Sequence, residues 1–157
     1  MGVEIQTVVT FQSTAFNVTE TKPYFINPSC YGDDVAKWMI AELRKNGVKT
    51  DDAPDQEDFG WYFGFQVAGG EHTFVIGFRP DDKTWIGWLE RNRGFARSIL
   101  GLRKRGIDPS AQQVLHSALL GSPEIRNVRW HFHGDFDKGR EERGTLNPLS
   151  SSQTTQR

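Results

Sequence analysis

The chain of 157 residues has one cysteine, almost no net charge and no long apolar run. Because Cys30 is alone, an internal disulfide and a thiolate metal cluster are both excluded, and a reducing compartment is favoured. The formal net charge of −1 gives no global reason to expect a nucleic acid or a membrane surface as partner. No segment approaches the roughly 18 consecutive apolar residues of a transmembrane helix, and the first residues lack the pattern of a secretion signal. We therefore expect a soluble, cytoplasmic protein with no membrane partner.

Aromatic residues are dense between residues 57 and 90, where the pattern predicts three antiparallel strands over 59–68, 71–79 and 84–90. Two glycines between alternating apolar runs are typical of a two-residue hairpin turn. A turn at Gly69-Gly70 places Phe65 opposite Phe74 and Trp61 opposite Phe78, so one face of the ribbon is aromatic. If the second loop is the four residues 80–83, the opposite face carries several large apolar side chains, which indicate a binding surface or a face covered by another segment: Tyr62, Val75, Ile86 and Trp88.

The rest of the chain predicts a sheet with helices packed against it. Alternation predicts an N-terminal hairpin from residues 3–11 and 16–18 and a last strand over 125–133. Apolar residues at helical spacing predict helices from Asp33 or Asp34 to Gly47, from Asp108-Pro109 to Gly121, and within 91–105. Residues 50–58, rich in acid, are expected to form a surface loop.

These elements define the fold class as α+β. We expect one domain over residues 1–137, with an antiparallel sheet of a central three-stranded meander, an N-terminal hairpin and a C-terminal strand, and about three helices on one face. Residues 138–157 are polar and lack apolar periodicity, so we expect a disordered tail.

A basic segment is the clearest local charge signal. Its residues lie within fifteen positions that contain no acid: Arg91, Arg93, Arg97, Arg103, Lys104 and Arg105. Gly94 and Phe95 stand where the expected helix begins, and free amides there suit an anion. This segment is the predicted site if the protein binds phosphate or nucleic acid, although nucleic acid is not the favoured partner. The acidic loop 51–58 is an alternative, internal partner for the same charges.

Two histidines and an aspartate near the chain end suggest a metal site as an alternative. His131 and His133 are two apart on the expected last strand and so share a face, and Asp135 follows two positions later. The spacing partly resembles the His-x-His-x-Asp-His core of metallo-β-lactamase-like hydrolases, but Phe136 stands where the last histidine belongs, and we reject that family. A metal-assisted hydrolase using His131, His133 and Asp135 stays open as a second hypothesis.

A further resemblance covers the first half of the chain. Asn27-Pro28, Tyr31-Gly32-Asp33-Asp34 and Glu57-Asp58-Phe59-Gly60-Trp61 occur in an order that resembles small bacterial proteins of unknown function. The resemblance implies a bacterial origin and brings no activity.

Since no nucleophile with an adjacent base and no phosphate-binding glycine loop occurs, we predict no catalytic residues and no cofactor. The leading hypothesis is a non-enzymatic domain that binds another protein or itself, as a homodimer, through the outer sheet face or the basic segment.

Overall fold

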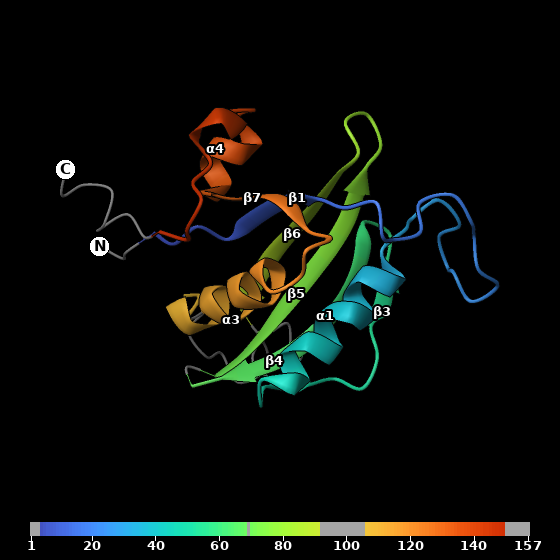
Figure 1. Ribbon diagram of the computed structural model, residues 1–157, viewed down its shortest axis with the longest axis horizontal. Helices are drawn as coiled ribbons and strands as arrows, with labels where there is room; N and C mark the ends of the chain where they lie inside the picture. Colours follow the sequence, from blue (N-terminus) through green and yellow to red (C-terminus); the bar gives the residue numbers. More distant parts are fainter. Residues whose placement is uncertain (1–3, 69, 92–105, 150–157) are drawn as a thin grey trace, which may run out of the picture.

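The computed structural model describes residues 4–68, 70–91 and 106–149, and within them seven strands form one sheet (Figure 1). The strand order is β2-β4-β5-β6-β1-β7, with β3 also paired to β4, and every pairing is antiparallel. The strands are β1 (Val8–Gln12), β2 (Lys49–Thr50), β3 (Asp55–Glu57), β4 (Gly60–Val67), β5 (Gly70–Arg79), β6 (Thr84–Arg91) and β7 (Arg126–His131). The α+β class with an antiparallel sheet is therefore confirmed.

Two helices, α1 (Asp33–Lys45) and α3 (Pro109–Leu120), contact each other and β4 on one side of the sheet. We call this side the inner face and the opposite side the outer face. The core lies between the helices and the inner face, where Met39 and Leu43 of α1 and Leu115 of α3 are fully buried with Phe63 and Trp130 of the sheet. Burial of this apolar surface is the main source of stability.

The central meander has the predicted strands, but the first register differs from the expected one. Val67 pairs with Gly70, so Phe65 lies opposite His72 and Trp61 opposite Ile76, two positions from the prediction. The glycine at 70 is already a strand residue, with φ of +115°. Because a shift of two residues keeps every side chain on its face, the aromatic side is still the buried one. The second loop has the predicted length, since Arg79 pairs with Thr84.

The predicted N-terminal hairpin is wrong. Strand β1 lies between β6 and β7, with Val9 opposite Gly87 on one side and Trp130 on the other. Residues 13–32 form a connector outside the sheet, from which Phe16 packs against Trp85. Consecutive residues 8–11 of β1 are buried, so both faces of this interior strand are covered, whereas alternation in sequence does not show which strands lie beside it.

The helix ends follow local chemistry. Gly32 is the N-cap of α1 and gives it no side-chain cap, whereas we predicted Asp33 or Asp34 in that role. Gly47 follows the helix with φ of +81°, as expected of a left-handed end. At α3 the predicted cap is confirmed, because the Asp108 carboxylate accepts from the Ser110 amide at 2.8 Å. The helix expected within 91–105 falls on residues 92–105, outside the described part of the chain.

The last strand ends earlier than predicted, and the chain continues on the outer face. Strand β7 stops at His131, and the short helix α4 (His133–Asp137) and the 3-10 helix η1 (Glu141–Arg143) follow. Hence the described helices do not all lie on one face. Residues 138–149, expected to be disordered, run beside the sheet: Thr145 exchanges two backbone hydrogen bonds of 2.8 Å with Trp130. Hydrogen bonds hold this segment, so apolar periodicity does not reveal it.

The acidic loop is also partly structured. Residues 55–57, inside the expected surface loop, form β3 and pair with β4. Gln56 fixes the connector beside it, because its side chain donates to the Asn27 carbonyl at 3.0 Å and accepts from the Asn27 amide at 3.2 Å. The carboxylates of this loop therefore stand on the edge of the sheet.

Candidate functional site

The outer face is built from rows of side chains that cross the sheet. Pairing places Tyr62, Val75, Trp88, Val8 and His131 in one row over β4, β5, β6, β1 and β7. Large rings on both sides cover Val75, which is 0% exposed. Where a row contains a glycine, no side chain stands on the sheet, and the surface is hollowed.

One such hollow, the aromatic hollow, has a volume of about 370 Å³. Gly77 of β5 lies at its floor, opposite Ile86 of β6. Phe59 comes from the turn before β4 and packs its ring 5.7 Å from that of Trp88. Apart from Gly77, the residues that line this hollow are Val8, Phe59, Phe78, Ile86, Trp88, His133, Phe136 and Asp137. An aromatic wall around an uncovered floor is suited to receive an apolar group.

The second wall of the aromatic hollow is α4. Phe136 packs its ring 5.5 Å from the buried ring of His131, which seats α4 on the sheet. At the rim His133 Nε2 lies 3.5 Å from Asp137 Oδ2, and both side chains are more than half exposed. An apolar pocket with a charged rim results.

The segment after α4 is fastened to the sheet by Arg79. Its guanidinium contacts Glu141 of η1 at 2.7 Å and Asp82 of the β5–β6 turn at 2.6 Å. The hydrogen bond from Arg79 lowers the pKa of the Glu141 carboxyl below its usual range, and the same bond raises the pKa of Arg79. Bidentate contacts of this kind fix geometry as well as charge.

The predicted sheet-face residues share the outer face, as the alternation predicts, but they do not line a single hollow. Ile86 and Trp88 line the aromatic hollow, while Val75 is buried between its neighbours. Tyr62 lies at the other end of its row and lines a second hollow. The sequence prediction missed Phe59, Gly77 and Phe136; the glycine on the outer face of β5 was a readable signal, whereas the position of Phe136 depends on where β7 ends.

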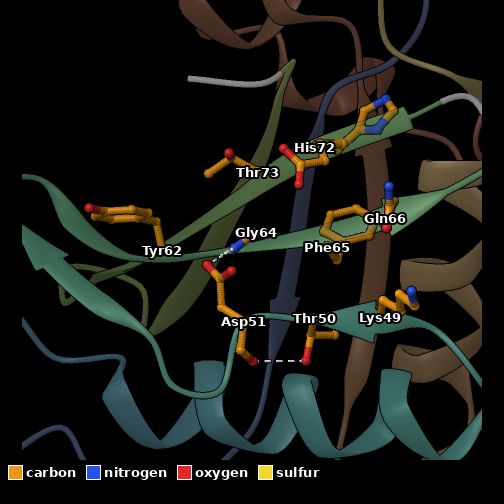
Figure 2. Close-up of a pocket in the computed structure, with 10 residues that line it drawn as sticks. Lys49, Thr50, Asp51, Tyr62, Gly64, Phe65, Gln66, His72 and Thr73 are labelled. Carbon is orange, nitrogen blue, oxygen red and sulfur yellow. Dashed lines mark hydrogen bonds between the residues drawn. The ribbon is translucent and has the colours of Figure 1, made fainter. Parts of the chain in front are cut away.

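Figure 2 shows the second hollow, the polar hollow, which lies over β2, β4 and β5 and has a volume of about 360 Å³. Its floor is Gly64, and Tyr62, Thr73 and Lys49 stand around it. The Asp51 carboxylate accepts from the Gly64 amide at 2.7 Å. Through this hydrogen bond one oxygen of the Asp51 carboxylate satisfies a backbone amide of β4.

The residues of the predicted metal site point to different partners. His131 is 2% exposed, and its Nε2 lies 2.8 Å from Thr10 Oγ1, while burial lowers the pKa of the imidazole. His133 lies beyond the strand, in α4, and Asp135 contacts Arg143 at 3.3 Å. Among residues 4–68, 70–91 and 106–149 no group of three or more His, Cys, Asp or Glu is placed to hold a metal ion.

Only the first residue of the predicted basic segment is described. Arg91 Nη1 lies 3.1 Å from His72 Nε2, which also accepts from the Asp108 amide at 3.0 Å. His72 Nδ1 lies 3.0 Å from the Gly70 carbonyl, so the neutral ring donates there and accepts at Nε2. Burial, as the largest cause, lowers the pKa of His72. Arg93, Arg97, Arg103, Lys104 and Arg105 lie outside the described residues.

Cys30 is not activated as a nucleophile, because burial raises the pKa of its thiol. Within the described residues, no helix has the length and apolar character needed to cross a membrane. Comparison of the chain with models of protein families, with curated proteins and with solved structures found no match.

Proposed function

We propose that this chain is a cytoplasmic, non-enzymatic binding domain, and that its aromatic hollow receives an apolar side chain of a partner protein. The observation that carries the proposal is the hollow of about 370 Å³ between Phe59, Trp88 and Phe136 over the bare floor at Gly77. Aromatic rings around a pocket are typical of the residues that dominate binding energy at protein interfaces.

The exposure of the walls supports a surface that is open to a partner. Phe59 is 46% exposed although it packs on Trp88, so its outer side faces solvent. Trp88 is held in place by a hydrogen bond of 3.0 Å from its indole nitrogen to Glu90. A rigid ring loses little conformational freedom when a ligand arrives, and this favours binding.

The expected affinity is modest. Burial of one Leu or Phe side chain contributes about 1.5–3 kcal/mol, and part of this is lost to the entropy of association. Contacts of the rim, where His133 and Asp137 lie, would add hydrogen bonds of about 1 kcal/mol each. We therefore expect a transient partner that binds in the micromolar range.

Selection from a library of random displayed peptides tests the proposal without knowledge of the natural partner. The peptides enriched by the wild-type domain are synthesised, and their dissociation constants are measured by calorimetry. Phe59→Ala removes one wall, and Ile86→Phe fills the hollow while keeping the strand apolar. The matched control is Leu120→Ala, because Leu120 is 60% exposed at the end of α3 and lines none of the described hollows.

We expect enriched peptides that share one apolar anchor residue and that bind both hollow variants about tenfold more weakly, which corresponds to about 1.4 kcal/mol. The Leu120→Ala control should bind like the wild type. The proposal would be contradicted if no peptide is enriched. It would also be contradicted if the enriched peptides bind both hollow variants with the same affinity as the wild type.

A further inference from the structure

A third hollow, the strand-end hollow, shares only Phe78 with the aromatic hollow and has a volume of about 470 Å³. It is bounded by the segment 12–18 after β1, by the β5–β6 turn and by the first residue of β7. Three distant parts of the chain therefore converge on it. This volume is within the range of roughly 300–1,000 Å³ that is usual for small-molecule sites.

The floor of the strand-end hollow is apolar and fixed by the core. Phe16, Val18 and Phe78 line it and are partly buried. Behind them Trp85, with 0% exposure, lies 6.1 Å from Phe16 and 4.7 Å from Phe78, measured between ring centroids. Because a buried tryptophan backs both rings, the floor is preformed.

The rim of the strand-end hollow is cationic. Lys83 and Arg126 line it, and within the described residues the side chain of neither forms an ion pair or a hydrogen bond. Asp82 also lines the hollow, but its two oxygens accept from Arg79 at 2.9 and 2.6 Å. Arg79 in turn holds Glu141. The only acidic residue in the described lining of the hollow is thus paired with Arg79. Within the same part of the chain, the side chains of Lys83 and Arg126 therefore stand without an acidic partner at the rim of an apolar floor.

The β5–β6 turn fixes the backbone of one of these cationic residues. Lys83 has φ of +55°, a left-handed conformation, and its amide donates to the Pro80 carbonyl at 3.3 Å. Left-handed backbone suits Gly or Asn better than lysine. A lysine at this position therefore costs some backbone strain.

We propose that the strand-end hollow binds a small amphiphile with one anionic head group, such as a medium-chain carboxylate. The chain lies over Phe16, Val18 and Phe78, where each buried methylene contributes about 0.8 kcal/mol. The head lies between Lys83 and Arg126, where charge-assisted hydrogen bonds hold it. This inference is independent of the function proposed for the aromatic hollow.

Calorimetric titration with three probes of equal chain length tests the proposal: sodium decanoate and decyltrimethylammonium, each below its critical micelle concentration, and decanol below its solubility limit. The test variant combines Lys83→Asn, which keeps a residue that tolerates the left-handed turn, with Arg126→Gln. The matched control combines Lys138→Gln with Arg140→Gln, two exposed cations that line none of the described hollows. Urea unfolding of both double variants shows that they fold.

We expect decanoate to bind the wild type with one site per chain, and the other two probes to bind at least about tenfold more weakly, because they lack the anionic head. The Lys83→Asn/Arg126→Gln variant should lose about tenfold of its decanoate affinity, while the Lys138→Gln/Arg140→Gln control keeps it. An Ile86→Phe variant should bind decanoate normally, since it fills the aromatic hollow alone.

Equal affinity for the three probes would overturn the proposal even if the double variant did not fold. So would decanoate binding that both double variants retain, or that is lost in Ile86→Phe. Binding only to vesicles of anionic lipid, with none to free decanoate, would replace the small ligand by a membrane surface and also refute the proposal.

Discussion

Replacement of Gln6 by methionine should destabilise the fold by about 2–3 kcal/mol, a large effect for one residue in a short segment before β1. The side chain of Gln6 is 0% exposed. Its Nε2 donates to the Trp130 carbonyl at 3.0 Å, and its Oε1 accepts from the Leu149 amide at 2.7 Å and from Thr145 Oγ1 at 3.1 Å. The Gln6 carbonyl also accepts from Gln112 of α3 at 2.7 Å. One residue therefore joins the start of the chain to β7, α3 and the final segment.

The magnitude follows from what each partner keeps. The Trp130 carbonyl still accepts from the Thr145 amide at 2.8 Å. The Thr145 hydroxyl has one proton, which it can donate either to Gln6 Oε1 or to the Asn147 carbonyl at 2.6 Å, so it keeps a partner in the variant. The Leu149 amide, which is part-buried, loses its acceptor, and an unsatisfied donor costs about 1–3 kcal/mol. Loss of the hydrogen bond to the Trp130 carbonyl adds roughly 1 kcal/mol, and the apolar methionine offsets part of the sum.

Urea unfolding followed by tryptophan fluorescence gives the free energy of unfolding for Gln6→Met and for a matched control, Gln113→Met. Gln113 is exposed on α3, so its replacement should change stability by less than about 0.5 kcal/mol. Hydrogen exchange should also become faster at the Leu149 amide in Gln6→Met alone. If Gln6→Met is as stable as the control, the hydrogen bonds of the Gln6 side chain do not stabilise the contact between the segment before β1 and the segment that contains Leu149. The reasoning is then refuted.

Three further predictions concern pH, packing and capping. Burial lowers the pKa of several histidines below the ordinary value of 6.5: His72, His116 and His131. As the pH falls below 6.5, these histidines bind protons in the unfolded chain more readily than in the folded chain. The free energy of unfolding, measured by urea titration, should therefore decrease when the pH is lowered from about 7 to about 5.5. A value that stays constant or increases would contradict this prediction. Gly87→Ala should destabilise the fold by about 1–3 kcal/mol, because the new methyl group collides with the Phe74 ring. In Gly134→Ala the methyl group of α4 meets open space, and this variant should be more stable by up to about 1 kcal/mol. Equal unfolding midpoints for the two variants would refute the packing argument. Asp108→Ala should cost about 1 kcal/mol through loss of the α3 cap, and a calorimetric unfolding temperature equal to that of the wild type would show that the cap is not needed.

Local signals predicted much of the fold, and long-range pairings account for what they missed. The Asp108-Pro109 start of α3, the glycine after α1 and the meander each depend on neighbours in sequence, and all appear in the structure. The strands that pair with β1 could not be predicted in this way. Alternation shows that a strand exists without showing which strands lie beside it. The predicted pairing of β4 with β5 differs from the observed one by two residues, because Gly70 belongs to β5 and not to the turn. The residue preferences of turns alone do not decide whether Gly70 lies in the turn or in the strand.

The candidate site was predictable in part for the same reason. Ile86 and Trp88 follow from alternation in the meander and do line the aromatic hollow. Phe59 and Phe136 reach it from a turn and from α4, and no periodicity connects those positions. His131 and His133 were expected on one strand face, but the strand ends at His131, and His133 is the first residue of α4.

Gly64 and Gly77 belong to β4 and β5, so the shape of the two hollows on the outer face depends on residues of the sheet itself. Neither has the left-handed backbone that only glycine adopts freely, but a Cβ atom would come within 3.2 Å of the Asp51 carboxylate at position 64 and within 3.1 Å of the Phe59 carbonyl at position 77. A single alanine would therefore have to displace a flexible carboxylate at position 64 but part of the backbone at position 77. The shape of the outer face thus depends on single residues of the strands themselves, and the polar hollow is the easier of the two to alter by one replacement.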